Sequence, residues 1–396
     1  TCCMYEGYAG KPHHGLKKKY EDFAHPILHI QINGKDFSKN KKGLQIPDVE
    51  VEMTSGFEAS IATFWIYNCY DRVTGEFAFD DLKKYICMGS CVIISMGYGV
   101  SAREIFRGFI SRVNFVFRQE EIPGVEITAM DVKGIMMSGN YSRQLKASSF
   151  SEAVKEILDK TAYVRLQSNE IITRLEITDT PDCRQSAGEK AGDRTIEMVC
   201  ESDYEFVVKA AKKYNYEFFS IGGTVYFRKA KNNTELLIEA APGDGLQSYE
   251  IGYDFTGLVQ QVEVRGMDVG KSKLISASRK LNNKLSQGNK AAPLIKNSQK
   301  VYIDPTVTSR EEADYRAGYL AEDISYRLGT MEAQFVGLPE LTPGRFMKIK
   351  GLGTAVSNTF YLVTVRHIMD ERGYITKVTG KAASMESEGA GIYGAF

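Results

Sequence analysis

One β-rich pattern occurs twice in this chain, and the duplication constrains the fold more than any other feature. The first copy is MGSCVIISMGYGVSAREIFRGFISRVN, residues 88–114, and the second is PGRFMKIKGLGTAVSNTFYLVTVRH, residues 343–367. Each copy contains a strand, a glycine-containing corner and a longer second strand. Chance similarity between two β-hairpins is the alternative explanation. We interpret the pattern as a true repeat of one β-unit.

Four glycines carry the comparison between the two copies. Gly97 and Gly99 of the first copy correspond to Gly351 and Gly353 of the second. Glycines inside strands mark sharp bends or close backbone approach, as at the corners of a barrel. We therefore predict two similar small β-barrels with these glycines at their corners.

Larger side chains follow the glycines at equal spacing. An aromatic residue comes seven positions after the second glycine of each copy, as Phe106 and Phe360. Seven positions further lie Val113 and His367. This spacing predicts that the two residues of each pair occupy equivalent places in the two barrels.

The order of patterns along the chain predicts a β-rich α+β protein in which an α+β domain separates the two barrels. Residues 1–25 are polar and have no regular period, so we expect a loosely ordered arm. The remaining predicted segments are a first β-barrel over 26–141, an α+β domain over 142–245, a second β-barrel over 246–385 and a tail over 386–396.

Local signals support the helices and one hairpin inside these segments. Helix starts are predicted by capping-box spacing at Ser149 with Glu152, Ser202 with Glu205 and Thr308 with Glu311. The last of these begins a helix over 308–328, whose apolar stripe is Ala313, Ala317, Leu320, Ile324 and Leu328. Gly222 and Gly223 predict a tight two-residue hairpin turn because they tolerate positive φ.

The second barrel segment contains a basic excursion over residues 271–300, which has no acidic residue. Its Ser, Asn and Gln content predicts a long exposed segment. One interpretation is a solvated loop, and the other is a surface that docks onto an acidic neighbouring protein. Contact with DNA is a lesser alternative, because the stretch lacks interleaved aromatic residues. The candidate docking residues are Lys271, Lys273, Arg279, Lys280, Lys284, Lys290, Lys296 and Lys300.

Overall charge gives no further indication of a partner. Fifty basic residues balance fifty acidic ones, so the composition does not favour nucleic acid as a specific ligand. We found no apolar run long enough for a membrane-spanning helix and no secretory signal. The seven cysteines form no CxxC pair, which favours reduced thiols in a cytosolic setting.

Catalytic residues are not indicated by the sequence. Of the five histidines, only His367 lies within the repeat, where we expect a hydrogen-bonded histidine at a strand end. Asp131 and Asp370 also follow strands, and we expect them to fix turns. Nothing in the sequence has the pattern of a lysozyme or a peptidase, so no enzyme activity and no cofactor are predicted.

Metal binding is similarly not predicted. Cys2 and Cys3 with the two neighbouring histidines, His13 and His14, match no standard zinc spacing. Cys87 and Cys91 flank a strand edge, where we expect buried thiols rather than ligands.

A trimer of a two-barrel chain would present six similar faces around one axis. Symmetric assembly usually produces closed rings. Such a ring could contact a six-fold partner on one side and a three-fold partner on the other.

Together, the order and spacing of several segments resemble the contractile-tail baseplate hub, the phage late control D or VgrG-like family. IFRGFISRVNFVF followed by GVEITAMDVKGIM resembles its first barrel, and SDYEFVVKAAKKYNYEFFSIGGTVYFRKA its α+β segment. LVQQVEVRGMD and GLPELTPGRFMKIKGLG, with FYLVTVRHIMDERGYITKV, resemble its second barrel. The resemblance spans roughly residues 27–383.

This resemblance implies a homotrimeric hub with pseudo-six-fold symmetry. Such hubs join the hexameric inner tube to the trimeric membrane-piercing spike in phage tails, bacteriocins and contractile injection systems. The chain departs from the fused form, because no oligonucleotide-binding fold and no β-helix follow residue 385. We therefore expect the spike to be a separate protein.

We expect a structural protein rather than an enzyme, assembled in the bacterial cytoplasm into a tail, bacteriocin or injection particle without stable membrane insertion. Its expected partners are two further copies of itself, a hexameric tail-tube protein, a trimeric spike and other baseplate components. Two alternatives stay open at this point. One is a tail-associated cell-wall hydrolase, and the other is a receptor-binding or carbohydrate-binding tail protein.

Overall fold

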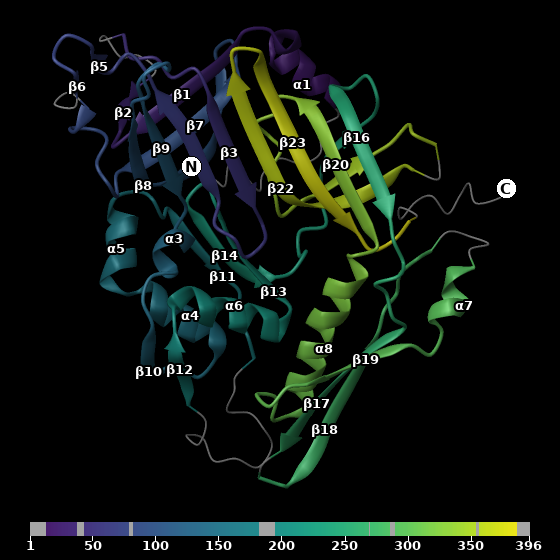
Figure 1. Ribbon diagram of the computed structural model, residues 1–396. Helices are drawn as coiled ribbons and strands as arrows, with labels where there is room; N and C mark the ends of the chain where they lie inside the picture. Colours follow the sequence, from purple (N-terminus) through teal and green to yellow (C-terminus); the bar gives the residue numbers. More distant parts are fainter. Residues whose placement is uncertain are drawn as a thin grey trace.

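One large sheet dominates the structure, a computed structural model (Figure 1). Pairing within this sheet is antiparallel except between β15 and β21. The β-rich prediction is therefore confirmed. The structure describes residues 13–37, 43–78, 82–181, 195–268, 270–285, 290–353 and 356–385.

We call the strands that come first along the chain the first module. They alternate buried and exposed positions, as expected for strands with one face on a core. β2, Lys35–Asp36, extends its edge, and β5, Tyr70–Asp71, pairs with β6, Glu76–Phe77, beside it. The first module consists of β1 (Pro26–Ile32), β3 (Val49–Thr54), β4 (Ile61–Ile66), β7 (Cys91–Tyr98), β8 (Ser101–Val116) and β9 (Gly124–Met130).

The second module lies in the C-terminal half of the chain. It consists of β15 (Leu236–Ala240), β16 (Leu246–Tyr253), β20 (Gly329–Val336), β21 (Phe346–Ile349), β22 (Asn358–Asp370) and β23 (Gly373–Ala382). β15 precedes the predicted domain boundary at residue 245, yet it pairs with β21. The boundaries of the predicted domains otherwise stay predictions.

Both modules have the same strand order across the sheet. It runs β3-β4-β9-β8-β7-β1 in the first module and β16-β20-β23-β22-β21-β15 in the second. The modules join where β22 pairs with β3, so strands from both halves of the chain lie side by side (Figure 1). The repeat is thus a duplicated strand arrangement. Closure of each copy into a separate barrel stays a prediction.

The two modules share one hydrophobic core. Buried side chains of the first module, such as Val51 and Phe64, belong to the same cluster as Phe335 and Phe360 of the second. Burial of apolar surface is the main favourable term in folding, so a shared core fixes one module against the other.

A separate core lies in the middle segment. Its helices are α3 (Lys133–Met136), α4 (Phe150–Leu158), α5 (Thr161–Ser168) and α6 (Asp203–Tyr214). Its strands are β10 (Tyr141–Leu145) with β12 (Ile196–Glu201), and β11 (Arg174–Ile177) with β14 (Thr224–Lys229) and β13 (Tyr216–Ile221). The predicted turn at Gly222 and Gly223 joins β13 to β14, and both residues have positive φ.

Helix starts follow the predicted caps in two of three cases. Ser202 and Glu205 form the complete capping box of α6. Ser149 caps α4 by accepting a hydrogen bond from the Glu152 amide. At the third helix, α8 (Arg310–Ser325), the predicted cap Thr308 is wrong by one residue. Ser309 is the cap, because its side chain accepts from the Glu312 amide. The predicted apolar stripe of this helix is buried.

α8 packs against a three-stranded sheet made of β17 (Gln261–Asp268), β18 (Lys273–Lys280) and β19 (Gln299–Ile303), and a short helix, α7 (Ala291–Ile295), precedes β19. This unit has a core of its own, which includes Val262, Val264 and Ala317.

The expectation of a loose N-terminal arm is wrong for residues 13–25. Helix α1 (His13–Lys19) and a 3-10 turn, Glu21–Phe23, form there. Leu16 and Tyr20 are almost fully buried in the core shared by the modules, and this burial stabilises the segment. Residues 1–12 and the predicted tail, 386–396, lie outside the described residues.

Candidate functional site

The same hydrogen-bond pair occurs at the start of both modules' hairpin units. The amide of Gly89 donates to the carbonyl of Ile110 over 2.8 Å, and the amide of Gly344 donates to the carbonyl of Leu362 over 2.9 Å. In return, the amide of Ile110 donates to the carbonyl of Ser90, and the amide of Leu362 donates to the carbonyl of Arg345. Both glycines have positive φ, near 80°. Chance resemblance does not account for a shared contact of this kind, so the repeat extends to backbone geometry.

The long strands β8 and β22 also share a register irregularity directly after that contact. Counting from it, Val113 corresponds to Val365 and Phe115 corresponds to His367. The predicted match of Val113 with His367, like that of the preceding aromatic pair, is therefore wrong by two residues. The cause is a difference in residue count, because Ile110 lies eleven positions after Gly99 whereas Leu362 lies only nine positions after Gly353.

The junction between the modules is a paired strand edge. β22 aligns with β3 over six residue pairs, with His367 opposite Val51. Arg366 forms ion pairs across this junction with Glu50 and Glu52. Because His367 and Val51 are fully buried, the junction is closed to solvent on its inner face.

His367 is held by three hydrogen-bonding groups. Its Nε2 lies 3.1 Å from the carbonyl oxygen of Leu341, which can only accept, so Nε2 carries the proton. Nδ1 then accepts from the Tyr374 hydroxyl over 2.7 Å, with Thr376 Oγ1 3.1 Å away. Burial lowers the pKa of His367 to about 4. The ring is therefore neutral near pH 7, and both of its nitrogens are hydrogen-bonded. This agrees with the prediction of a hydrogen-bonded histidine.

A second buried polar group connects the N-terminal helix to this region. Glu340 is almost fully buried and accepts from Lys19 Nζ over 2.8 Å and from the Tyr20 hydroxyl over 2.5 Å. Lys19 is the last residue of α1, and Tyr20 follows it directly. Sequence reasoning missed this contact, because more than 300 residues separate the partners and no local pattern connects them.

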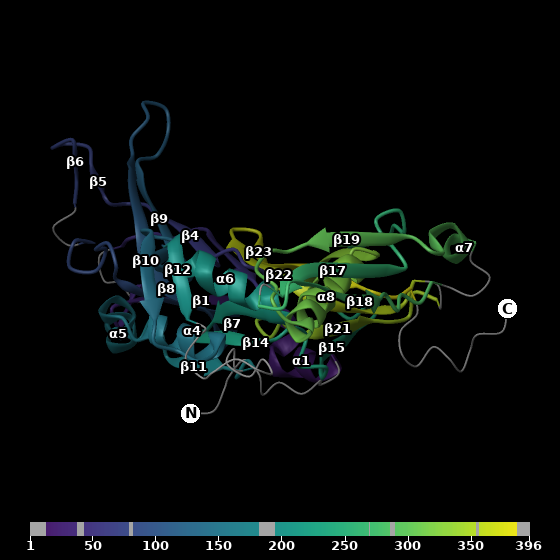
Figure 2. The same cartoon turned by 90° about the horizontal axis from the view of Figure 1, so that it is seen from below.

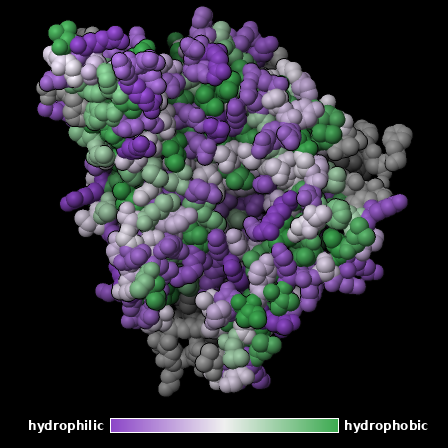
Figure 3. Space-filling view, viewed as in Figure 1, coloured by the Kyte–Doolittle hydropathy of each residue, from purple (hydrophilic) through white to green (hydrophobic). Residues whose placement is uncertain are grey.

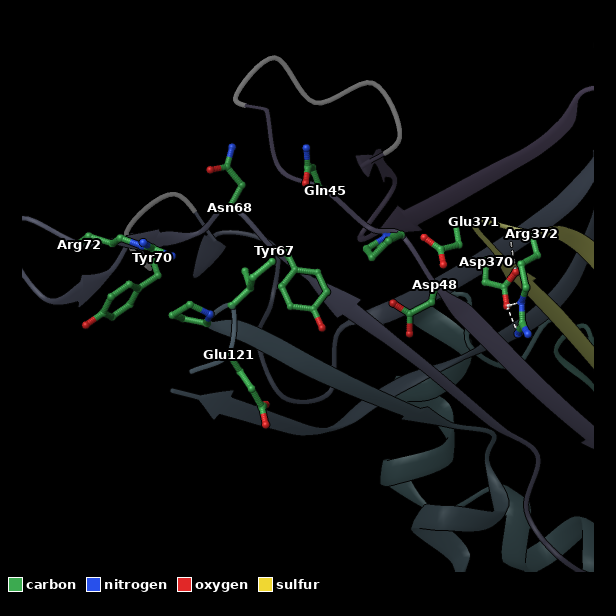
Figure 4. A pocket seen from close by; sticks show the side chains of 13 residues that line it. Gln45, Asp48, Tyr67, Asn68, Tyr70, Arg72, Glu121, Asp370, Glu371 and Arg372 are labelled. Carbon is green, nitrogen blue, oxygen red and sulfur yellow. Dashed lines mark hydrogen bonds and ion pairs between the residues drawn. The ribbon is translucent and has the colours of Figure 1, made fainter. Parts of the chain in front are cut away.

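An open cleft of about 910 Å³ lies beside the module junction (Figure 4). Asp48, Tyr67 and Glu121 line it together with the turn between β22 and β23. Burial, and then the charge of Asp370, raise the pKa of Asp48. Asp370 itself is occupied in its turn, because it accepts from the Arg372 amide over 2.8 Å and pairs with the Arg372 guanidinium. The turn-fixing prediction for Asp370 is thus confirmed.

Asp131, the other aspartate considered from the sequence, also fixes a turn. Its two carboxylate oxygens accept from the amides of Ser60 and Lys133, each over 3.0 Å. The Lys133 side chain donates to the carbonyls of Gly56 and Glu58. Burial lowers the pKa of Lys133 to about 8, and the charge of Asp131 limits the fall.

The predicted basic excursion is partly regular structure. β18 pairs along its whole length with β17, and Ile275 and Ala277 on it pack against the core of the α8 unit. This part of the segment therefore belongs to a folded unit and is not simply an exposed loop. The eight basic residues predicted from the sequence are nevertheless all exposed.

Some of these basic side chains have acidic partners within the chain. Arg279 pairs with Asp314 of α8, and Lys271 lies 3.8 Å from Asp268. The other six form no ion pair with the part of the chain that the structure describes. The docking role of this stretch stays a prediction.

The four predicted corner glycines lie at the two corresponding hairpins. Gly97 is inside β7, where a Cβ would overlap the Ser101 carbonyl, and Gly99 follows in the turn with positive φ. Gly351 and Gly353 have positive φ in the loop after β21. Close approach and turn geometry thus explain these glycines locally, while their role as barrel corners stays a prediction.

Cysteine and histidine groups show no metal-like arrangement within the described ranges: no cluster of three or more His, Cys, Asp or Glu side chains occurs there. Cys2 and Cys3 lie outside those ranges, and the side chains of His13 and His14 are not described. Cys91 is buried as predicted, and burial raises its pKa to about 11. The same prediction is wrong for Cys87, whose thiol is exposed and donates to the Lys83 carbonyl.

Exposed apolar side chains gather at one corner of the first module. Val73, Phe115, Phe117 and Ile122 are all exposed there. Figure 3 shows hydrophobic atoms among hydrophilic ones over the corner that carries β5 and β6. In Figure 2 the hairpin of β8 and β9 extends beyond the body of the molecule on this side. Sequence reasoning missed this surface, because an alternating strand pattern does not reveal which edges lack a neighbour.

Comparison with known proteins gives one family and several similar folds. A family model described as the Alg8 N-terminal domain matches residues 25–371. The tail protein from Neisseria meningitidis MC58 is 11% identical, covers 90% of this chain and 97% of its own, and has a TM-score of 0.64. The 43 kDa tail protein of prophage MuSo2 from Shewanella oneidensis is 9% identical, with 90% and 98% covered and a TM-score of 0.64.

A component of the E. coli type VI secretion system, described as similar to T4 bacteriophage tail proteins, is 9% identical. It has a TM-score of 0.53 over 91% of this chain and 78% of its own. No curated protein matches the sequence significantly. Within the described residues, no helix is both long and apolar enough to cross a membrane. At such low identity these similarities establish the fold: this chain has the fold of phage tail and type VI secretion proteins.

Proposed function

This chain belongs to the Alg8 N-terminal domain family, and from its fold we propose that it is a structural hub in the baseplate of a contractile tail or injection particle. Three copies would form a ring with near-six-fold shape. The ring would join a hexameric tail-tube protein to a trimeric spike. Such a protein would be assembled in the bacterial cytoplasm and become part of the particle.

One observation carries the proposal, namely the duplicated strand order in a single sheet. The two modules repeat the same order of six strands and are joined edge to edge through β22 and β3. The outermost pair differs in direction, because β1 is antiparallel to β7 whereas β15 is parallel to β21. Three chains of two modules each supply six similar units, whereas three-fold symmetry relates only the chains. A partner with six subunits and a partner with three can therefore both match such a ring.

Rigidity supports a mechanical role. The shared core and the ion pairs of Arg366 with Glu50 and Glu52 fix the angle between the modules. A tail hub must transmit force from the tube to the spike, so a fixed angle suits the proposed role. The exposed basic residues of 271–300 would contact an acidic neighbour, such as the tube, the spike or another baseplate protein.

We also propose that the chain is not an enzyme. His367 is neutral near pH 7, buried and fully bonded, and Asp370 is engaged by Arg372. Neither group is therefore well placed to act as a general acid or base. Specific recognition of nucleic acid and stable membrane insertion are not part of the proposed role.

The experiment is to purify the full chain and measure its mass by mass photometry, with negative-stain images of the same sample. We expect trimers that show six similar lobes around one axis. A monomer at every soluble concentration, or a ring with another number of copies, would contradict the proposal. Loss of turbidity when the pure chain is added to peptidoglycan would instead favour the hydrolase alternative.

A further inference from the structure

Two of the strand edges in the large sheet that have no partner among the described residues belong to β8 and β16. β8 pairs with β7 only up to Phe109, and the rest of that edge, Arg112–Val116, has no strand partner among the described residues. β16 pairs with β20 on one side, and its other edge has no partner strand there either. Edges of this kind expose backbone donors and acceptors that can pair with another chain.

The internal repeat identifies, for each of these two edges, the equivalent strand edge in the other module. Counted from the shared register irregularity, the free part of β8 corresponds to the part of β22 that pairs with β3. β16 occupies the place in the second module that β3 occupies in the first. The two free edges are thus the counterparts of the two strands that form the junction within the chain.

The alignment of these counterparts follows from the residues that lie opposite one another on neighbouring strands, which we call a row. In the first module one row contains Val113, Ile127, Phe64 and Val49. In the second module the matching row contains Val365, Val378, Ala333 and Tyr249. Tyr249 therefore stands where Val49 stands, and Phe117 stands where Met369 stands.

Exposure differs sharply between these counterparts. His367 and Met369 are 0% and 8% exposed, whereas their counterparts Phe115 and Phe117 are 45% and 59% exposed. Val49 is 1% exposed, whereas Tyr249 is 46% exposed. Phe115 contacts the Phe77 ring within the chain, but that contact leaves nearly half of its surface open. Phe115, Phe117 and Tyr249 are thus exposed, whereas their counterparts in the other module are buried in the pairing of β22 with β3.

We propose that β8 of one copy pairs antiparallel with β16 of a second copy, in the register that β22 and β3 use within one chain. The inference deepens the proposed function and rests on it for the number of copies. Repeating one junction within and between chains makes every module-to-module step alike. The expected opposite pairs are Arg112 with Asp254, Val113 with Tyr253, Phe115 with Ile251 and Phe117 with Tyr249.

The side chains brought together in this register are complementary. Arg112 and Asp254 are exposed and opposite in charge, and neither has an ion pair with the described residues of its own chain. Phe117 would meet an aromatic residue, and Phe115 an aliphatic one. Cross-strand pairs of both kinds stabilise antiparallel sheets. A register shifted by one residue would place the aromatic side chains on opposite faces of the sheet.

The test uses the full chain and compares Phe115→Asp with Val164→Asp, a change on α5 at a position with the same 45% exposure. Each variant is first checked for an unchanged unfolding midpoint. Mass photometry then measures the oligomer. We expect Phe115→Asp to be monomeric and Val164→Asp to be trimeric like the wild type.

A charge exchange tests the register itself. Arg112→Glu and Asp254→Arg should each weaken the trimer, and the double variant should restore it, because opposite charges then face each other again. Trimers in Phe115→Asp, or no restoration in the double variant, would overturn the pairing while leaving the trimeric hub intact. A wild-type chain that is monomeric at every soluble concentration would contradict both proposals.

Discussion

The buried histidine of the module junction gives a quantitative prediction about pH. His367 is fully buried, and its Nε2–H and Nδ1 are both engaged by protein groups. With its pKa lowered from 6.5 to about 4, charging His367 in the folded chain costs about 3 kcal/mol. The unfolded chain binds this proton near pH 6.5, whereas the folded chain binds it only near pH 4. The stabilisation is thus complete above pH 6.5 and is lost as the pH falls towards 4.

The perturbation is His367→Gln, which is neutral throughout this range. Glutamine can donate to the Leu341 carbonyl and accept from the Tyr374 hydroxyl, so both main contacts can be kept. Urea unfolding at fixed protein concentration, in steps from pH 7 to pH 4, gives the free energy of unfolding of each protein. We expect the wild type to lose about 3 kcal/mol more than the variant across this range.

The control is Met369→Leu, two residues further along β22. This change alters packing at the same junction without adding or removing a titrating group, so its pH curve should parallel that of the wild type. If the His367→Gln curve also runs parallel to the wild type, then the neutral, desolvated state assigned to the histidine is wrong.

Two further predictions concern the basic surface and a corner glycine. Lys273→Glu combined with Lys300→Glu should lower the yield of assembled particles while leaving the unfolding midpoint within about 2 °C, because surface substitutions usually change stability little; unchanged yield would reject docking through this surface. Gly97→Ala should destabilise the chain by roughly 1–3 kcal/mol in urea unfolding, because its Cβ would overlap the Ser101 carbonyl; Gly353→Ala, which has open space but positive φ, should cost about 1 kcal/mol.

Local structure was predictable wherever the physical cause was local. The capping box at Ser202 and the turn at Gly222–Gly223 depend on neighbouring residues, and both were found as predicted. The apolar stripe of α8 was also correct, while its cap was wrong by one residue. Thr308 and Ser309 can both cap a helix, and only the tertiary structure decides which one does.

The repeat was predictable as a pattern, but its register was not. Glycine spacing identified the two hairpins. Counting equal numbers of residues from the glycines then predicted that Val113 and His367 occupy equivalent places. That prediction failed by two residues, because the second copy has two residues fewer between its second corner glycine and the shared register irregularity. Differences of this kind change residue counts without changing the strand order, so alignment by counting fails after the first loop.

Contacts between distant parts of the chain were beyond prediction from one sequence. The pairing of β22 with β3 and the contact of Glu340 with Tyr20 each join residues more than 300 positions apart. Neither leaves a periodic trace. The polar arm likewise gave no sign that Leu16 and Tyr20 would be buried, because two apolar residues at this spacing do not define a helix.

The proposed pairing between chains also predicts how the trimer responds to salt. At each interface Arg112 and Asp254 would form one exposed ion pair, worth about 0.2–1 kcal/mol and weakened by screening. Covering the open halves of Phe115 and Phe117 would contribute roughly 1 kcal/mol each, and Tyr249 adds to that sum. Apolar burial and backbone pairing therefore outweigh the charge term.

It follows that the trimer should persist in high salt, and that Phe115→Asp should weaken it more than Arg112→Glu does. Dilution series in low and high salt, followed by light scattering, would measure both effects. Salt can slow the encounter of the chains by screening their charges, but it does not remove buried apolar surface. Dissociation by salt alone would mean that charge holds the copies together, and the ranking of these contributions would then have to be reversed.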